Sequence, residues 1–239
     1  MDPPFLRRRP ETEVARVIRV ITEASTTPAE VEARDGRRWV LKFSGAGPGP
    51  YGLLIEYVAL AIARAFGTPV PEARPLWLAE DFPWMAGTDE FDSMLRRSPG
   101  WNLGIALVPD ARPATAAEAL AADPAMLETI ARSDCLLANV DRMPPNPNLI
   151  LADGRLWSID YDACLYLSRA LGPARPAEIA LPVGHFLRAR WPEPRRAPVP
   201  PLDFDMLVGA VPGAWIAAAG NDRARIAEAL RAYVAAWAA

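Results

Sequence analysis

The sequence predicts an α+β fold that is divided into a strand-rich first part and a helix-rich second part. Three observations support this prediction. Runs of β-branched and alternating apolar residues lie mostly before residue 108, apolar residues at helical spacing dominate after it, and one hairpin pattern is embedded in the second part. Strands and helices do not alternate along the chain, which disfavours a doubly wound sheet. We therefore expect two lobes, residues 1–108 and 109–239.

Four strands and one helix are expected in the first part. Asp35-Gly36 is a typical hairpin turn between strands. Apolar residues recur at helical spacing up to Gly67, which can end a helix in the left-handed conformation. Residues 80–100 show no regular pattern, so no element is expected there. The expected strands are 14–21, 37–43, 73–79 and 103–108, and the expected helix is 53–66.

The second part is expected to be helical around a single hairpin. Asp123 followed by Pro124 is a typical helix start. Asp153-Gly154 predicts a tight turn between two short strands, 149–152 and 156–159. The expected helices are 115–122, 123–138, 178–191, 204–211, 213–219 and 222–238.

Composition limits the class of protein. The chain has 239 residues, 51% hydrophobic and 23% charged, which excludes intrinsic disorder. Its two cysteines are too few for a disulfide scaffold or a cysteine zinc site. No apolar run is long enough to span a membrane, and the N-terminus lacks the apolar segment of a signal peptide. A net charge of −3 argues against nucleic-acid binding. We expect a cytoplasmic protein with no membrane contact.

Lys42 is the only lysine among 26 basic residues, all the others being arginine. Nucleotide bias explains the excess of arginine, so a lone lysine indicates a position where a compact ammonium is needed. Lys42 lies on a predicted strand, and Glu56 follows on the next predicted helix. An ion pair between them would aim the ammonium group.

The segment 47–52 fits the pattern G-x-G-x-x-G of dinucleotide-binding proteins. That pattern acts through backbone N–H groups directed at a pyrophosphate, and Pro48 and Pro50 have none. We therefore expect this segment to be a flexible connection between strand and helix, which could still close over a ligand.

Phosphoryl transfer requires a carboxylate near the acceptor hydroxyl, oxygen ligands for Mg²⁺ and a cation on the phosphates. Asp141 in a loop, an asparagine at the start of a strand and Asp160 at the end of the next strand supply the first two. Lys42 supplies the third. Taken singly, Asp141-Arg142 would indicate a surface ion pair and residues 146–148 a turn. Their occurrence in this order in one chain favours phosphoryl transfer over these simpler interpretations.

These segments resemble the protein-kinase-like fold, most closely the HipA-like kinases, and the order Asp-Arg is also similar to phosphoinositide kinases. The resemblance covers about residues 14–167. The matching segments are Trp39-Val40-Leu41-Lys42-Phe43, Leu54-Ile55-Glu56-Tyr57, Asn139-Val140-Asp141-Arg142, Asn146-Pro147-Asn148-Leu149-Ile150 and Trp157-Ser158-Ile159-Asp160.

The resemblance implies a bilobal kinase that transfers the γ-phosphate of ATP to a hydroxyl of a protein Ser or Thr or of a small molecule. It implies that Lys42, oriented by Glu56, contacts the α- and β-phosphates. Asp141, with Arg142 beside it, would act on the acceptor hydroxyl. Further nucleotide contacts are expected from Ser25, Thr26 and Thr27 in the loop after the first strand, and from Ala106, Leu107 and Val108 in a hinge that grips adenine.

The resemblance assigns Mg²⁺ to Asp160 and to one of two asparagines. Asn146 has the spacing from Asp141 that many kinases show, whereas Asn148 directly precedes the strand and faces Asp160 across the hairpin better. We favour Asn148 and keep Asn146 as the alternative.

Two departures from the family leave other functions open. The nucleotide loop, residues 24–29, contains no glycine, and Asp160 is followed by Tyr161-Asp162. A nucleotide-binding module of the same fold without catalysis is therefore one alternative. A metal-dependent hydrolase using Asp141, Asp160 and Asp162 is another. His185, the only histidine, is expected to pack in the interior, and no histidine-based catalytic triad is possible.

Overall fold

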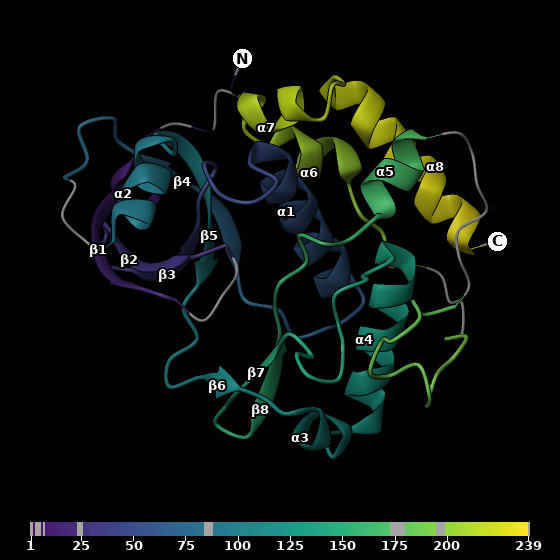
Figure 1. Ribbon diagram of the computed structural model, residues 1–239. Helices are drawn as coiled ribbons and strands as arrows, with labels where there is room; N and C mark the ends of the chain where they lie inside the picture. The colour runs from purple at the N-terminus through teal and green to yellow at the C-terminus, as the bar shows by residue number, and fades with distance from the viewer. Residues whose placement is uncertain are drawn as a thin grey trace. The chain divides into compact units, whose positions relative to one another are not determined.

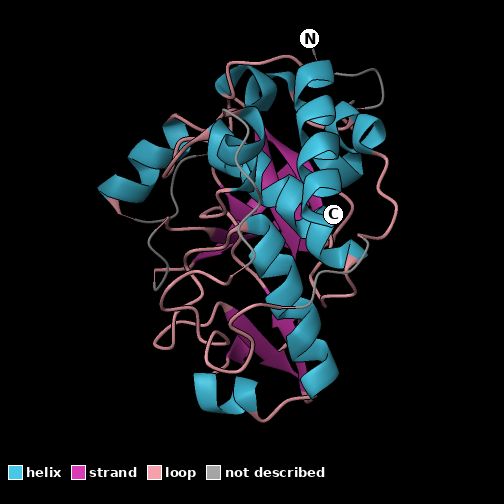
Figure 2. Cartoon of the chain, turned by 90° about the vertical axis from the view of Figure 1, so that its right-hand side faces the viewer, coloured by secondary structure: helices cyan, strands magenta, loops and turns pink. Residues whose placement is uncertain are grey.

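The computed structural model describes residues 2, 6, 8–22, 26–83, 88–172, 180–194 and 199–238. The chain forms two compact units, each made of three segments. Unit 1 consists of Met1–Tyr57, Glu72–Leu107 and Ala210–Asn221, and unit 2 of Val58–Pro71, Val108–Gly209 and Asp222–Ala239. Both units contain helices and antiparallel strands (Figures 1 and 2), which confirms the α+β class. One of the divisions falls between Leu107 and Val108.

The described part of unit 1 is built on a five-stranded antiparallel sheet with the strand order β1-β2-β3-β5-β4. A short 3₁₀ helix, Pro10–Thr12, precedes it. The strands are β1 (Val14–Val20), β2 (Ala29–Ala33), β3 (Arg38–Lys42), β4 (Ala73–Leu78) and β5 (Gly100–Ala106). Gly36 in the turn between β2 and β3 has φ +83°, as the Asp35-Gly36 hairpin signal predicts. Strand β2 was not expected, because its five residues between turns give too short a pattern.

One face of this sheet packs against helix α2 (Asp89–Arg96), which lies over the strands in Figure 1. Thr88 caps the helix by accepting a hydrogen bond from the backbone of Phe91. Phe91, Met94 and Leu95 enter the core of the sheet, and the Phe91 ring meets Phe43 edge-on at 5.7 Å. The expectation of no element over residues 80–100 was wrong here, since an eight-residue helix carries few apolar positions.

Gly104 of β5 has no room for a side chain. A Cβ atom there would lie 2.8 Å from Cγ of Leu76 on the neighbouring strand. We expect Gly104→Ala to lower the free energy of unfolding by about 1–3 kcal/mol, the usual cost of overpacking. Gly209→Ala is the control, because no atom of the described residues lies within 4 Å of a Cβ atom at that position. Urea unfolding measures both, and equal stabilities of the two variants would contradict this packing.

Within its described residues, unit 2 contains a three-stranded antiparallel sheet with the order β6-β7-β8 and several helices. Its strands are β6 (Arg112–Pro113), β7 (Leu149–Ala152) and β8 (Arg155–Ser158). Its helices are α3 (Ala116–Leu120), α4 (Pro124–Leu137), α5 (Tyr166–Leu171), α6 (Phe204–Gly209) and α8 (Arg223–Ala238). Helix α1 (Pro50–Ala65) passes from unit 1 into unit 2 after Tyr57, and α7 (Gly213–Ala218) belongs to unit 1.

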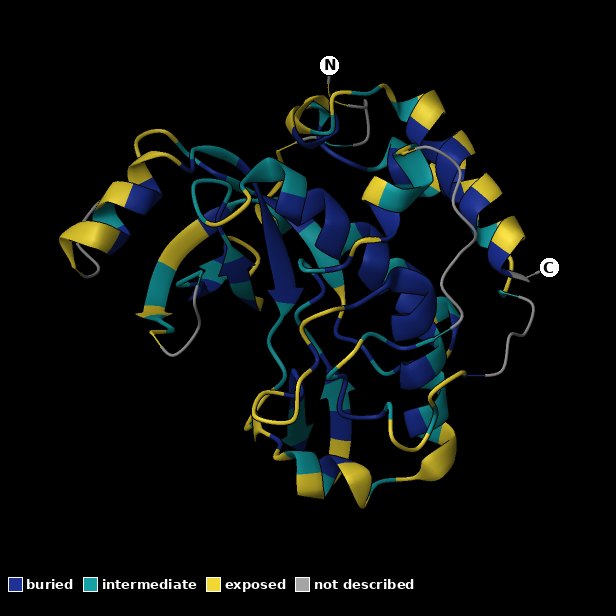
Figure 3. Cartoon of the chain, turned by 45° about the vertical axis from the view of Figure 1, so that its right-hand side comes forward, coloured by how far each residue is buried: buried dark blue, intermediate teal, exposed yellow. Residues whose placement is uncertain are grey.

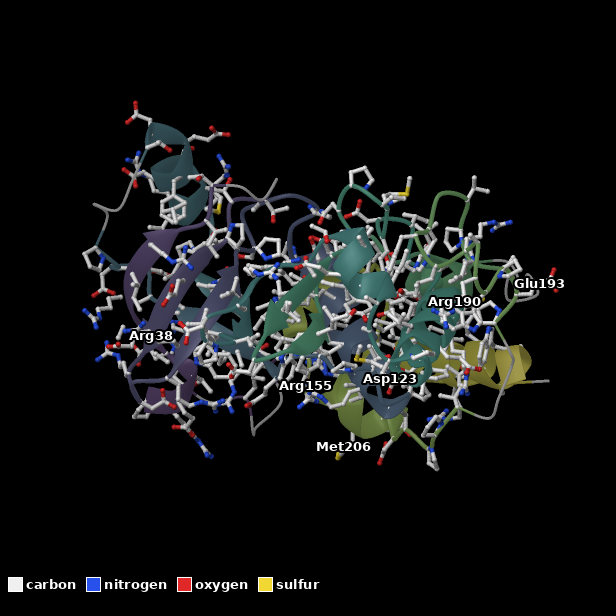
Figure 4. The ribbon with its side chains drawn as sticks, turned by 90° about the horizontal axis from the view of Figure 1, so that it is seen from below. Arg38, Asp123, Arg155, Arg190, Glu193 and Met206 are labelled. Carbon is white, nitrogen blue, oxygen red and sulfur yellow. The ribbon has the colours of Figure 1, made fainter. Side chains whose placement is uncertain are left out.

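Helix α4 begins as the sequence predicts. The Asp123 side chain accepts a hydrogen bond from the backbone of Ala125 at 3.0 Å, and Pro124 occupies the first turn. Asp123 and Arg155 of β8 are both exposed, and both are labelled in the view from below in Figure 4. The inner face of α4 shares a core with the small sheet, and Figure 3 shows the alternation of buried and exposed faces. The buried positions fix how α4 lies against β7 and β8.

The expected helix over residues 178–191 is wrong for residues 180–191, which form turns. Gly184 has φ +91°, a conformation that no α-helix contains, and Pro182 precedes it. Residues 178 and 179 lie outside the described residues. Among the described helices, none is long and apolar enough to cross a lipid bilayer.

Candidate functional site

Lys42 and Glu56 form a buried ion pair in unit 1. Strand alternation directs Trp39 and Leu41 into the core shared with α2, which places Lys42 on the opposite face of β3. Glu56 of α1 lies there, and its Oε2 is 2.6 Å from Nζ of Lys42. The side chains are only 12% and 1% exposed. Two charges removed from water to this extent depend on each other, because either one would be costly to bury alone.

A buried hydrogen-bond network of Asn102 and Ser98, which we call the latch, fixes the chain directly after Lys42. The side chain of Asn102 on β5 is fully buried and accepts a hydrogen bond from the backbone of Ser44 at 2.7 Å. Its amide nitrogen donates to the carbonyl of Ser98, whose hydroxyl in turn accepts from the backbone of Gly45. The latch therefore sets the path from β3 into the loop that leads to α1.

We expect Asn102→Ala to lower the free energy of unfolding by about 1–3 kcal/mol, because it leaves buried backbone groups without partners. Asn221→Ala is a matched control in the same unit. Asn221 donates one hydrogen bond to the carbonyl of Ala219 and is only partly buried. Chemical denaturation should show a smaller loss of unfolding free energy for Asn221→Ala than for Asn102→Ala. The reverse order would contradict the structural role of Asn102.

The residues expected to contact the nucleotide in unit 1 are partly described. Ser25 lies outside the described residues. Thr27 has a left-handed backbone with φ +46°. A Cβ atom on Gly47 would lie 3.2 Å from Cγ2 of Thr26, so the loop after β1 approaches the Gly-Pro loop before α1. The glycine at 47, which also has φ +50°, permits that approach.

The expected adenine hinge follows β5. The backbone N–H of Ala106 donates to the carbonyl of Glu72 at 2.7 Å, and that of Leu107 donates to the carbonyl of Arg38 at 3.2 Å. Both amide groups are therefore engaged within unit 1. An adenine base that approaches this segment would have to bind to the carbonyl oxygens of Ala106 and Leu107 or to the backbone of Val108.

Asp141 and Asn148 are brought together in unit 2. The amide nitrogen of Asn148 donates to Oδ2 of Asp141 at 3.0 Å and to its backbone carbonyl at 3.2 Å. Asn148 is buried and has a left-handed backbone with φ +50°. Asn146 is exposed, and its side-chain oxygen accepts from the backbone of Asn148 at 3.4 Å. This geometry favours Asn148 over Asn146 as the asparagine beside Asp141.

The hairpin joins Asn148 to the segment that carries Asp160. The backbone N–H of Ile159 donates to the carbonyl of Asn148 at 3.1 Å, and Leu149 pairs with Ser158. Asp160 follows with φ +62° and is half-buried, and its carboxylate oxygen lies within 4.8 Å of that of Asp162. The carboxylates of Asp160 and Asp162 and the side-chain carbonyl of Asn148 are oxygen donors, the kind of ligand that Mg²⁺ prefers.

Tyr161 secures this segment from the interior. It is fully buried, and its hydroxyl shares a 2.7 Å hydrogen bond with the hydroxyl of Ser158. Burial raises the pKa of the Tyr161 phenol, so it is uncharged.

Arg142 is completely buried and acts within the loop. Its Nε donates to Oδ2 of Asp134 at 2.6 Å, and its Nη1 donates to the carbonyls of Pro147 and Asn148, each at 2.8 Å. Burial is the largest single effect on Asp134 and raises its pKa. The charge of Arg142 and the hydrogen bonds from His185 and Arg142 together outweigh burial and hold the pKa of Asp134 below its ordinary value. Arg142 therefore positions the loop from the interior.

Sequence reasoning did not identify Asp134. A signal was present, because Asp134 lies on the apolar face of α4, in register with Leu127, Ile130 and Ala131, all buried. An acidic residue at such a position requires a buried partner. Asp134 also accepts hydrogen bonds from Asn139 and contacts His185.

Comparison with known proteins gives likenesses to solved structures. No family model matches the chain, and no curated protein matches its sequence. The chain is similar to the crystal structure of a Helicobacter pylori proinflammatory kinase, CtkA, with 15% sequence identity and a TM-score of 0.43. The match covers 65% of this chain and 58% of that chain, so less than two thirds of CtkA is matched. A likeness at this level assigns neither activity nor substrate.

Proposed function

We propose that this chain is an Mg²⁺-dependent phosphotransferase of the HipA-like kind, which transfers the γ-phosphate of ATP to a hydroxyl group. The observation that carries the proposal is the buried pair of Lys42 and Glu56, with 2.6 Å between Nζ and Oε2. A buried ion pair adds little stability over apolar residues of the same size. An ammonium aimed by a buried carboxylate is, by contrast, what binding to phosphate groups requires.

The loop and hairpin of unit 2 supply the remaining chemistry. Asp141 is exposed, and we assign it to the acceptor hydroxyl, which it would orient and whose proton it would accept. Asn148 and Asp160, with Asp162, would hold Mg²⁺, which neutralises charge on the phosphates when bound. The acceptor is a Ser or Thr of a protein or a small-molecule hydroxyl.

The proposal is tested by incubating the protein with Mg-ATP and measuring ADP release and the intact mass. We expect ADP formation or addition of phosphate to the chain, and loss of both in Asp160→Asn. Asp153→Asn is the matched control, because Asp153 lies in the exposed turn at the other end of the same hairpin with φ +49°. No ADP and no added phosphate with any hydroxyl acceptor would overturn the proposal.

A nucleotide-binding module without catalysis is the second candidate. The loop at residues 24–29 has no glycine, and the backbone amides of Ala106 and Leu107 are engaged. Such a module would be stabilised by Mg-ATP, by about 2.7 kcal/mol at a hundredfold excess over Kd, without turnover. Thermal unfolding with and without Mg-ATP, beside the ADP assay, distinguishes the two functions.

A further inference from the structure

Three buried side chains in unit 2 form a chain of hydrogen bonds beneath the loop at residues 139–148. Asp134 of α4, Arg142 of the loop and His185 of the turn at residues 182–187 all have fully buried side chains. Oδ2 of Asp134 accepts from Nε of Arg142 at 2.6 Å and lies 3.0 Å from Nε2 of His185. We call this set the Asp134–Arg142–His185 relay.

The contacts of His185 define its tautomer. The backbone N–H of Leu187 donates to Nδ1 of His185 at 3.2 Å, so Nδ1 acts as an acceptor and carries no proton. The proton of a neutral imidazole then sits on Nε2, which donates it to Asp134. Both ring nitrogens therefore have partners, and the ring orientation is set by the backbone on one side and by the carboxylate on the other.

The relay ends at the residues to which we assign chemistry. Nη1 of Arg142 donates to the carbonyls of Pro147 and Asn148, and the amide of Asn148 donates to Asp141. The turn at residues 182–187 also contacts the loop at residues 139–148 directly, because the backbone N–H of Phe186 donates to the carbonyl of Arg142 at 3.0 Å. A displacement of Arg142 would move Asn148 and, with it, the carboxylate of Asp141.

We propose that His185 is a positioning residue, which holds Asp134 and, through Arg142, sets the placement of Asn148 and Asp141. Its consequence for phosphotransfer rests on the proposed function, whereas its effect on the loop does not. An apolar residue would fill the same interior space but would leave Asp134 one donor short. Partners of this kind, one step removed from the reacting groups, commonly affect activity or metal affinity by about 10–100-fold.

Side-chain amide signals in nuclear magnetic resonance give a readout that needs neither activity nor metal. The chain has five asparagines and no glutamine, so its side-chain NH₂ spectrum contains five pairs, each assignable by substitution. We expect His185→Phe to shift the pairs of Asn139 and Asn148 while those of Asn102 and Asn221 in unit 1 stay in place. His185→Gln, which can donate to Asp134, should return the Asn148 pair toward its original position.

Thr68→Val is the matched control. Thr68 shares a buried 3.1 Å hydrogen bond with Ser133, the neighbour of Asp134 on α4. The control should leave the Asn148 pair unchanged. The proposal is overturned if Asn148 is unmoved in folded His185→Phe, or if Thr68→Val moves it equally.

A measurement on the wild type covers the case in which His185→Phe does not fold. Long-range ¹H–¹⁵N spectra of the single imidazole should show the proton on Nε2, and a proton on Nδ1 would overturn the relay. If phosphotransfer is observed, its kcat should fall about 10–100-fold in His185→Phe and recover in His185→Gln. Expected amide shifts without any phosphotransfer would refute the proposed function and leave the positioning role intact.

Discussion

Replacing Lys42 with methionine is expected to reduce phosphotransfer by about 10²–10³-fold, the usual effect of removing one preorganised charge-stabilising group. Methionine keeps the apolar stem and removes the ammonium, so the phosphates lose their cation while β3 keeps its packing. The measurement is the initial rate of ADP formation at saturating Mg-ATP. A folded Lys42→Met protein that works at the wild-type rate would contradict the role of Lys42.

Stability has to be separated from catalysis in this experiment. Glu56 is 1% exposed, and removing the Lys42 ammonium from beside it can cost about 3–5 kcal/mol. The double variant Lys42→Met/Glu56→Gln removes that buried charge, and we expect it to regain stability but not activity. Lys42→Arg tests the shape of the cation. We expect it to fold and to react slowly, because a planar guanidinium cannot replace a compact ammonium at the same site.

The parts of the fold that local sequence patterns specify were predictable. The Asp35-Gly36 turn, the cap at Asp123 and the β7–β8 hairpin each depend on a few adjacent residues, and the structure contains all three. Elements of five to eight residues, β2 and α2, were missed. Their stability comes from tertiary contacts with the rest of unit 1, which a short apolar pattern does not reveal.

The candidate site divides in the same way. The ion pair of Lys42 with Glu56 was inferable, since a strand and the next helix carry the two residues. The hydrogen bond from Asn148 to Asp141 was not predicted, because from the sequence Asn148 was expected only to face Asp160 across the hairpin. The contact of His185 with Asp134 joins residues 51 positions apart, and the intervening chain gives no period that would predict it. The turn that carries His185 was also taken for a helix, which would have directed the imidazole elsewhere.

Arg142→Leu is expected to lower the free energy of unfolding by about 3–5 kcal/mol. The substitution leaves the carboxylate of Asp134 fully buried without its cation, and removes both hydrogen bonds to the carbonyls of Pro147 and Asn148. Arg231→Leu is the matched control in the same unit. Arg231 pairs with Asp205 at 2.7 Å, but both side chains are more than half exposed, so we expect a loss below about 1 kcal/mol.

The pH dependence of the stability difference between wild type and Arg142→Leu tests whether the buried charge of Asp134 causes it. In the wild type the pKa of Asp134 is lowered from its ordinary value of 3.8, so the carboxylate contributes stability above about pH 3.8 that is lost as the pH falls further. Without Arg142, burial favours the protonated form of Asp134, so the variant loses less of its stability as the pH falls. The stability gap between wild type and Arg142→Leu should therefore narrow as the pH falls from 7 toward 4. Urea unfolding across this range measures the gap, and a gap that stays constant, or one no larger than that of Arg231→Leu, would show that the buried charge of Asp134 is not what Arg142 compensates.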